Sequence, residues 1–342
     1  NGDMAVAQRA TTSTSTGIET CDRWNVRTTN TDDLAITQAQ STTVPGHGFK
    51  FSYKYDTTTA ESALASDEAL AIETRLEANT LQGLKYGTGD AETATLAFWV
   101  RGSLTGVHGI YIRTHDGAQE FVQSYNIDAA DTWEQKIINI PANTAKVINN
   151  DNGIGWWIQW GLAAGTGVDG ATLGSWHDNA TEIFPSGQVN YMANTSYEFY
   201  LTGVQLEIGT YTSTTLPKFQ FESFGDNLLR CQRYLNRMVQ NGSDSNIRFA
   251  VGVCKSSTSS EYGYLVYPEL RDTPAVTFSS TSSHYRANSD SARSGSSGPT
   301  VDNRHKNGCR PSLTVSSGQT SGYAAMFEAN NDAAFIELDA EL

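Results

Sequence analysis

Residues 93–102 read TATLAFWVRG and place Leu96, Phe98 and Val100 on one side of the chain, with Trp99 on the other. The same alternation recurs in three later segments: residues 109–117 (GIYIRTHDG), 154–162 (IGWWIQWGL) and 197–209 (YEFYLTGVQLEIG). An apolar residue at every second position is typical of a β-strand with one buried face. Clusters of Gly, Asn and Asp separate these segments, as turns between antiparallel strands require. The pattern therefore predicts a β-sandwich or jelly roll.

The composition also indicates an all-β fold class. Only 18% of the 342 residues are charged, 10% are aromatic, and Thr, Ser, Asn and Gly are abundant. Long helices favour Ala, Leu, Glu and Lys, whereas strands and turns favour the residues that dominate here. The chain is too long for one ordinary core, so we expect two domains.

The charge balance excludes two classes of partner. The chain carries 23 Lys and Arg against 37 Asp and Glu, which gives a net charge of −14. Nucleic acids and anionic membranes are bound through clustered Lys and Arg, so we expect neither to be the main partner. The sequence also lacks a run of 18 apolar residues. We therefore expect no membrane insertion.

A short helix is expected at residues 226–238, where the apolar residues recur at steps of three and four: Leu228, Cys231, Leu235 and Met238. Asp226 stands where an N-cap residue would stand. This helix divides the chain into a jelly-roll domain of residues 1–222 and a second part of residues 223–342. The second part comprises the short helix and a smaller C-terminal β-sandwich domain.

Two segments leave their secondary structure open. Residues 64–81 contain much Ala, Glu and Leu, which favours a helix, yet Leu70, Ile72 and Leu76 could line one face of a strand. We expect a loop followed by a strand from about Leu70. Residues 281–306 are rich in Ser, Asn and Arg and predict either a long exposed loop or a strand with few apolar residues.

The four cysteines have no spacing that suits zinc: Cys21, Cys231, Cys254 and Cys309. We expect them to be buried thiols. A disulfide such as Cys254 with Cys309 is the alternative.

Tryptophans gather in the second half of the first domain, at positions 156, 157, 160 and 176. On a strand, Trp156 and Trp160 share one face, while Trp157 and Gln159 share the other. Exposed aromatic rings stack against sugar rings, and polar neighbours supply hydrogen bonds. The candidate carbohydrate-binding residues are Trp157, Trp176, Gln159, His177, Asp178 and Asn179. In the alternative interpretation, one face is sandwich core and the other lies beneath a loop.

The sequence contains no motif of a catalytic triad, a metallohydrolase, a P-loop or a dinucleotide site. No pair of carboxylates stands out as the acid and nucleophile of a glycosidase. Glu19, Asp22 and Glu207 are possible oxygen ligands for calcium, but no loop holds closely spaced carboxylates. We therefore predict that the protein is not an enzyme and has no cofactor and no metal site.

Several phrases together resemble one module of bacteriophage and prophage tail-fibre or appendage proteins. They occur in the expected order over nearly the whole chain: NGDMAVAQR (1–9), CDRW (21–24), AIETRLEA (71–78), LAFWVRGSLTGVHGIYIRTHDG (96–117), YNIDAADTWEQKIINIP (125–141), the passage from FYLTGVQLEIG to CQRYLNRM (199–238), YPELRDTPAVTF (267–278) and SGYAAMFEANNDAAFIELDAEL (321–342). The QLEIG to CQRYLNR passage and the DAEL ending are the most specific. One departure is visible, because the family often has two aromatics after CQR and here Tyr234 is followed by Leu235.

The resemblance implies that residues 1–222 form a jelly roll similar to carbohydrate-binding modules, and that residues 223–342 form a helix and a smaller β domain. It also implies a location on the virion, contacts with other virion proteins and a homotrimer. The leading functional hypothesis is a tail-fibre subunit that attaches to a host cell-surface glycan. The alternative is a purely structural capsid, collar or baseplate appendage without glycan binding. A glycan depolymerase is disfavoured because such spikes rest on long repetitive β-helices, and the sequence has no such repeat.

Overall fold

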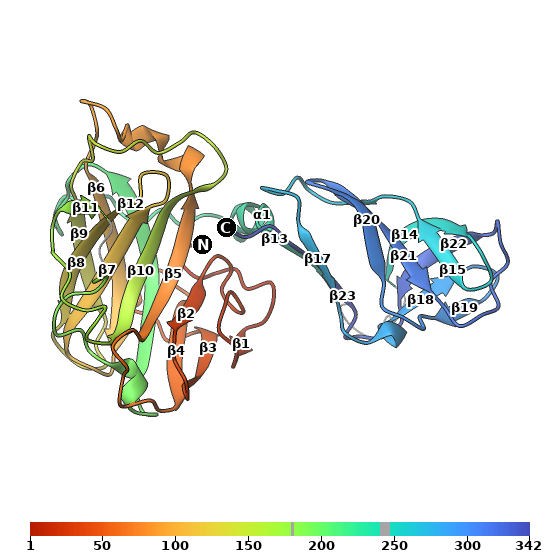
Figure 1. The fold of residues 1–342 in the computed structure, drawn as a ribbon, viewed down its shortest axis with the longest axis horizontal. Helices are drawn as coiled ribbons and strands as arrows, with labels where there is room; N and C mark the ends of the chain where they lie inside the picture. The colour runs from red at the N-terminus through yellow and green to blue at the C-terminus, as the bar shows by residue number, and fades with distance from the viewer. Residues whose placement is uncertain (179–180, 240–246) are drawn as a thin grey trace. The chain divides into compact units, whose positions relative to one another are not determined.

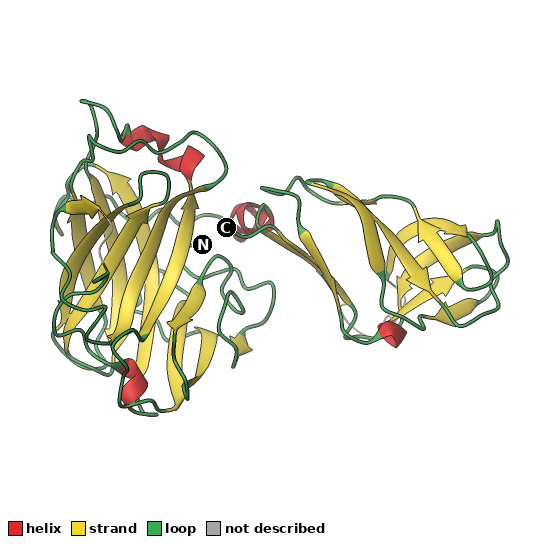
Figure 2. Cartoon of the chain, in the orientation of Figure 1, coloured by secondary structure: helices red, strands yellow, loops and turns green. Residues whose placement is uncertain are grey.

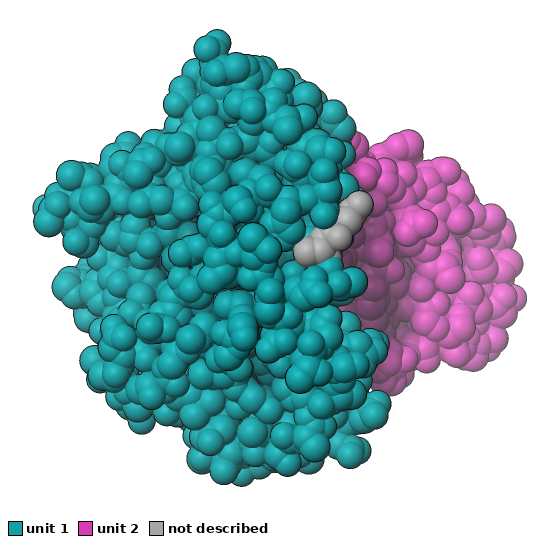
Figure 3. Space-filling model, turned by 60° about the vertical axis from the view of Figure 1, so that its left-hand side comes forward, with its two compact units in different colours: residues 1–228, 342 teal, residues 229–341 magenta. Residues whose placement is uncertain are grey.

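The computed structural model describes residues 1–178, 181–239 and 247–342. Strands dominate the described chain, with one α-helix and three short 3-10 helices among those residues (Figure 2). The chain divides into two compact units (Figure 3). Unit 1 comprises residues 1–228 together with Leu342, and unit 2 comprises residues 229–341. The all-β prediction is confirmed.

Unit 1 is a sandwich of two antiparallel sheets, each with six strands among the described residues (Figure 1). Sheet A has the order β1 (Thr12–Ser13), β3 (Ala35–Ser41), β4 (Ser52–Thr59), β12 (Glu198–Ile208), β6 (Ala94–Gly102) and β9 (Glu134–Ile140). Sheet B has the order β11 (Trp176–Asp178), β8 (Gln119–Ile127), β7 (Gly106–Thr114), β10 (Ile154–Ala164), β5 (Ala69–Glu77) and β2 (Asn25–Thr29). The short helices η1 (Ala78–Leu84) and η2 (Tyr191–Ala193) complete the unit.

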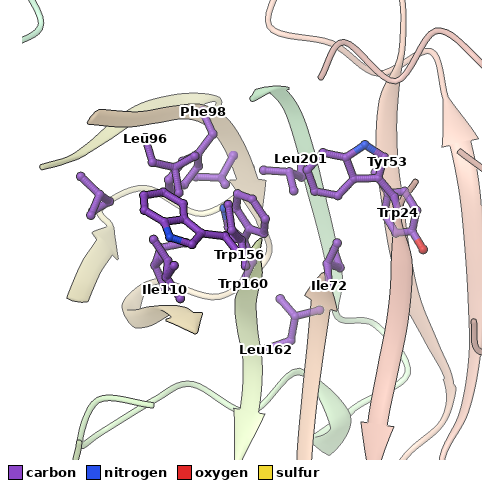
Figure 4. Packing of buried hydrophobic residues seen from close by; sticks show 14 of the residues in the cluster. Trp24, Tyr53, Ile72, Leu96, Phe98, Ile110, Trp156, Trp160, Leu162 and Leu201 are labelled. Atoms are coloured by element: carbon purple, nitrogen blue, oxygen red, sulfur yellow. The ribbon is translucent and has the colours of Figure 1, made fainter. Parts of the chain in front are cut away.

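The core of unit 1 lies between the inner faces of the two sheets (Figure 4). Trp160 of β10 packs against Trp24 at 5.3 Å between ring centroids and against Phe98 of β6 at 5.6 Å. Both Trp156 and Trp160 are fully buried. Buried aromatic rings of this size remove about 150–250 Å² each from water and dominate the energetics of a core. The alternation of residues 93–102 and 154–162 therefore arises because each strand turns one face to this core.

The segment that was ambiguous in sequence forms strand β5 from Ala69 to Glu77. Its pairing with β10 and β2 buries Leu70 and Ile72 completely. The expected strand from about Leu70 is confirmed, because two flanking strands supply the backbone hydrogen bonds that a helix would have made internally.

A helix is present near residues 226–238, but both of its predicted ends are wrong. Helix α1 runs from Phe224 to Gln232. Its first turn is capped by the hydroxyl of Ser223, which accepts a hydrogen bond from the backbone N–H of Asp226 at 3.2 Å. After the helix, Leu235–Val239 form strand β13, which pairs with β23 (Phe335–Asp339). Long-range strand pairing therefore overrides the local helical period.

Unit 2 contains two antiparallel sheets within the described residues. The smaller sheet has the order β13, β23 (Phe335–Asp339) and β17 (Ala275–Phe278). The larger sheet has the order β16 (Leu265–Val266), β21 (Gly308–Thr314), β15 (Ser259–Tyr262), β14 (Arg248–Cys254), β22 (Ala324–Ala329), β18 (Tyr285–Asn288) and β19 (Ala292–Ser294), while β20 (Thr300–His305) also pairs with β21. A short helix η3 covers Ser282–His284. Of the two interpretations of residues 281–306, strands with few apolar residues are the correct one.

All four cysteines are buried, and none of them forms a disulfide. The expectation of buried thiols is confirmed, and the alternative disulfide between Cys254 and Cys309 is not present. No helix among the described residues is long and apolar enough to cross a membrane.

Candidate binding pocket on sheet B

The outer face of sheet B, which points away from the core, carries a row of polar and aromatic side chains. Trp157 of β10 stands opposite Arg75 of β5 on one side and Arg113 of β7 on the other. Residues that stand opposite each other in antiparallel strands project from the same face. The neighbouring row on this face places Gln159 between Glu73 and Tyr111. Four strands therefore contribute to one surface, since Glu120 of β8 stands opposite Arg113.

The buried carboxylate of Glu73 connects the side chains of this surface through hydrogen bonds. Its side chain is 1% exposed and accepts four hydrogen bonds. The donors are Trp157 Nε1 at 2.7 Å, Gln159 Nε2 at 3.0 Å, Asn25 Nδ2 at 2.7 Å and Arg75 Nη2 at 3.0 Å. An ionised carboxylate offers about four acceptor positions, so the binding capacity of Glu73 is filled. A buried charge is tolerated only when it is paired and hydrogen-bonded in this way, and the result fixes the positions of Trp157 and Gln159.

The ring of Trp157 is surrounded by cations and one aromatic edge. The guanidinium carbon of Arg27 lies 4.7 Å from the ring centroid, and that of Arg75 lies 5.3 Å from it. Both distances are typical of cation–π contacts. The ring of Tyr111 meets the indole at 6.4 Å and an interplanar angle of 85°. Trp157 is therefore not an open stacking platform, and any ligand meets its edge together with the adjacent guanidinium groups.

Tyr111 is held by a second buried carboxylate. Its hydroxyl donates a hydrogen bond to Glu120 Oε1 at 3.0 Å, and Glu120 is 3% exposed. Burial, and then the adjacent negative charge of Glu120, raise the pKa of Tyr111, so the hydroxyl remains protonated. Arg113 Nη1 lies 4.0 Å from the same oxygen of Glu120. The two carboxylates, Glu73 and Glu120, thus position one aromatic residue each.

These side chains enclose a pocket of about 210 Å³, which we call the sheet B pocket. Its lining residues are Arg27, Thr29, Ala69, Ala71, Tyr111, Arg113, Glu120, Trp157, Gln159, Ile183 and Phe184. Pockets for drug-sized ligands hold roughly 300–1,000 Å³. The sheet B pocket is therefore of a size for a single small ring or one monosaccharide unit.

One wall of the pocket is the segment that follows β10 and crosses the outer face. Phe184 from this segment is fully buried against the sheet. It fits there because two strands carry glycine beneath it: a Cβ atom at Gly161 would approach Phe184 Cδ1 to 2.5 Å, and one at Gly109 would approach it to 3.0 Å. Backbone hydrogen bonds from Ile183 and Phe184 to the carbonyl of Val168 at 2.8 and 3.1 Å complete the wall.

The structure brings together only some of the residues selected from the sequence. Trp157 and Gln159 both line the sheet B pocket. His177 stands opposite Glu120 on the edge strand β11, and Asp178 pairs with Lys146 at 3.3 Å. Neither is among the residues that line the pocket. Asn179 lies outside the described residues.

Trp176 lies on the opposite face of sheet B from Trp157. It stands opposite Phe121, which is fully buried, and its ring contacts Phe121 at 5.6 Å and Tyr86 at 5.8 Å. Its indole N–H donates to the carbonyl oxygen of Pro141 at 2.8 Å. Trp176 therefore packs against the core. This agrees with the alternative interpretation of the tryptophans, in which one face of the sheet is sandwich core.

Sequence reasoning missed five residues of this site: Arg27, Glu73, Tyr111, Arg113 and Glu120. They come from β2, from β5 and from the β7–β8 hairpin, three segments that are far apart in the sequence. The strand register that places them side by side is a tertiary property, so no local motif marks them. The one signal in the sequence was the set of positions between the apolar residues of each alternating strand, because these positions face away from the core.

A second cavity of about 600 Å³ lies on the outer face of sheet A. Trp99 of β6 forms part of it, and the ring of His47 stacks on Trp99 at 4.8 Å with an interplanar angle of 25°. Phe49, Phe219 and Phe221 form an aromatic trio at its side, with centroid distances of 4.9–5.0 Å. We call this the sheet A pocket. It is more aromatic than the sheet B pocket and has no buried carboxylate among its lining residues.

The described residues contain no group of three or more His, Cys, Asp or Glu side chains that could hold a metal ion. Asp22, one of the calcium candidates, is buried and accepts hydrogen bonds from the backbone N–H and the side-chain amide of Gln8 at 2.8 and 2.5 Å. Its two oxygens are therefore engaged in local structure.

Comparison with known proteins gives distant structural likeness only. No protein-family model matches the sequence, and no match was found among curated proteins. This chain is similar to the enzymatically active domain of tailspike protein 4 of bacteriophage CBA120, at 12% identity over 54% of this chain, with a TM-score of 0.31. It is also similar to an arabinose-bound α-L-arabinofuranosidase, at 12% identity over 55% of this chain, with a TM-score of 0.30.

A third similar structure is the family 11 carbohydrate-binding module from Clostridium thermocellum in complex with a β-1,3-1,4-mixed-linked tetrasaccharide. The identity is 10%, the match covers 58% of this chain and 96% of that module, and the TM-score is 0.30. By contrast, this chain spans only 19% of the tailspike domain and 23% of the arabinofuranosidase. At these identities and scores the likeness concerns the β-sandwich alone, so function is argued below from the residues of the pocket.

Proposed function

We propose that unit 1 binds a glycan in the sheet B pocket. The observation that carries this proposal is the pair of buried carboxylates, Glu73 and Glu120, that hold Trp157 and Tyr111 around a cavity of about 210 Å³. A buried polar network costs stability unless every member is satisfied, and it positions side chains precisely. The network thus fixes both rings at the rim of the cavity before any ligand is present.

The chemistry of the pocket suits a sugar ring. The edge of Trp157 and the ring of Tyr111 offer apolar contact to the C–H groups of a sugar. Around them, the side-chain amide of Gln159 and the guanidinium groups of Arg27 and Arg113 offer hydrogen-bonding groups to hydroxyl oxygens. Apolar walls with a few fixed polar groups are the usual composition of a small-ligand site.

The experiment that tests this proposal is glycan binding by the purified chain, measured on a glycan array and then by calorimetry. We expect Trp157→Ala to abolish binding. Trp99→Ala is the matched control, because Trp99 is also half-buried on an outer sheet face but lies in the sheet A pocket. Absence of any glycan ligand would overturn the proposal. Loss of binding in Trp99→Ala alone would overturn the assignment to sheet B.

At the level of the organism, we propose a virion tail-fibre or appendage subunit that attaches to a host-surface glycan. The sequence phrases that resemble such proteins support this, together with a pocket sized for one monosaccharide unit. One small site of this kind binds weakly, and a homotrimer would present three sites and bind through avidity. Purified protein should then compete with virions for host cells. Failure of the protein to bind cells that bear the glycan ligand would contradict the attachment role.

A purely structural appendage remains the second candidate, and one observation in unit 2 favours an assembly role. Strand β14 carries the exposed apolar residues Val251 (62% exposed) and Val253 (42% exposed), which stand opposite Met326 and Ala324 of β22. Exposed apolar strips of this kind are typical of contacts between protein chains. Mass photometry of the wild-type chain and of Val251→Ser decides whether this strip joins copies of the chain into a trimer.

A further inference from the structure

We infer that the sheet B pocket selects a sugar that carries a carboxylate, such as a hexuronic or sialic acid. This inference rests on the proposed glycan-binding function and names the class of glycan. The arginines around the pocket differ in whether they already have acidic partners.

Arg75 is paired, because its Nη2 atom lies 3.0 Å from Glu73 Oε1. Arg27 differs, since the described residues offer its guanidinium no hydrogen-bond acceptor and no ion pair. The guanidinium lies against the face of Trp157. The stacking holds the planar guanidinium in place while its N–H edges stay available, a geometry that suits bidentate binding of a carboxylate.

Arg113 is only partly satisfied. Its Nε atom is buried and has no hydrogen-bond partner among the described residues. The nearest acidic contact of the side chain is Nη1 to Glu120 Oε1 at 4.0 Å, which is an ion pair and too long for a hydrogen bond. A buried guanidinium donor without an acceptor is unfavourable, so a ligand oxygen in this position would be stabilised.

The net charge of the pocket also favours a ligand with a carboxylate. Among the residues that line the pocket, Arg27 and Arg113 face one carboxylate, that of Glu120, while Arg75 and Glu73 neutralise each other beside it, so the site carries one more positive than negative charge. The chain as a whole carries a net charge of −14. A cationic pocket on an acidic protein is specific for a local negative group and does not attract polyanions such as nucleic acid in general. A monovalent carboxylate on a small ring supplies that charge within the volume of the pocket.

A neutral sugar would be bound less well for a defined reason. Its hydroxyl groups can meet Gln159 and Tyr111, but they leave the charge of Arg27 without a counter-charge. A site built to pair a charged group discriminates strongly against the analogue that lacks it. The carboxylate is therefore the feature that distinguishes ligands, and the ring supplies shape.

The test compares oligogalacturonate, oligoglucuronate and sialyllactose with the carboxyl-reduced form of each, in which the carboxylate has become an alcohol. Calorimetry with the full chain should give an affinity about tenfold or more higher for at least one acidic sugar than for its reduced partner. Arg27→Gln should remove that preference. Arg101→Gln is the matched control, because Arg101 also lies over an aromatic ring, that of Tyr200 at 5.0 Å, but on sheet A.

Each outcome separates this inference from the proposal on which it rests. If sugars bind, Trp157→Ala abolishes binding and carboxyl reduction has no effect, the glycan site stands and the acidic selectivity is overturned. If Arg101→Gln removes the preference as fully as Arg27→Gln does, the preference arises from general charge and the inference is also overturned. If no acidic or neutral sugar binds, the inference is overturned together with the proposed function.

Discussion

The two faces of strand β10 both carry tryptophan, but the side chains on the two faces differ in burial and in hydrogen bonding. On the inner face, Trp156 and Trp160 are fully buried, and their indole N–H groups have no hydrogen-bond partner within the described part of the chain. On the outer face, Trp157 is half-buried, yet its indole N–H donates to a buried carboxylate at 2.7 Å. The rings that contribute most to packing are thus the least constrained by polar contacts.

This difference separates two uses of tryptophan. On the inner face the ring fills volume, and the area that it removes from water outweighs the cost of an unsatisfied donor. On the outer face the ring is fixed in one orientation by Glu73, which packing alone would not require. Burial by itself would therefore not identify the tryptophan that lines the sheet B pocket.

The largest effect on this comparison should come from Trp160→Ala. Removal of a ring that packs against Trp24 and Phe98 leaves a cavity, and we expect a loss of about 3–5 kcal/mol in the free energy of unfolding of unit 1. Denaturant unfolding monitored by circular dichroism measures the loss. Trp157→Ala is the control on the other face. An equal loss of stability in both variants would show that the two faces do not differ as described.

The next effect concerns a titratable residue on the inner face. His108 of β7 is fully buried between Tyr125 and Tyr191, and burial lowers its pKa to about 4. In the unfolded chain the pKa is near the ordinary value of 6.5, so the unfolded state binds more protons between these two values. The contribution of the neutral imidazole is therefore complete above about pH 6.5. It is lost as the pH falls toward 4, by about 3 kcal/mol in total.

The variant His108→Gln should flatten the dependence of unfolding free energy on pH between 6.5 and 4, whatever its stability at neutral pH. His115→Gln is the control, because His115 is exposed in the turn after β7. Parallel pH curves for the wild type and His108→Gln would contradict the buried neutral histidine.

The smallest expected change in unfolding free energy concerns the indole N–H groups of the adjacent Trp156 and Trp157. Trp156→Phe removes an N–H without a partner but also leaves a cavity in a fully buried site, so its loss of stability comes from packing. Trp157→Phe removes a donor from Glu73, and a hydrogen bond to a charged group is worth about 1.5–3 kcal/mol. Chemical denaturation of both variants, each alone and combined with Glu73→Gln, should show a coupling energy for Trp157→Phe and none for Trp156→Phe. Equal coupling energies would contradict the difference between the two tryptophans.

The fold class could be predicted because alternation is a local property. Leu96, Phe98 and Val100 follow one another at every second position, and each is buried as that period requires. The end of helix α1 could not be predicted in the same way, because Leu235 and Met238 continue the three- and four-residue steps of the helix and give no local sign of a strand. Only the pairing of Leu235 with Asp339 and of Met238 with Ile336, a hundred residues later, decides between them.

The binding pocket was only half predictable for a related reason. Trp157 and Gln159 could be selected, because they alternate with the core residues of one segment. Trp176 looked equivalent in sequence, yet its place opposite Phe121 turns it toward the core. Arg27 and Glu120 reach the pocket through strand order and register, which no single segment encodes.

The glycine pair beneath Phe184 has a consequence for how this protein can diversify. Gly109 and Gly161 receive one phenyl ring, and that ring packs the part of the chain around Phe184 against the sheet. Neighbouring positions on the segment, such as Ile183 in the pocket wall, can then be exchanged without disturbing the strands. A side chain at either glycine, by contrast, would displace Phe184 or its neighbour Pro185, so this part of the pocket wall depends on two positions in other strands.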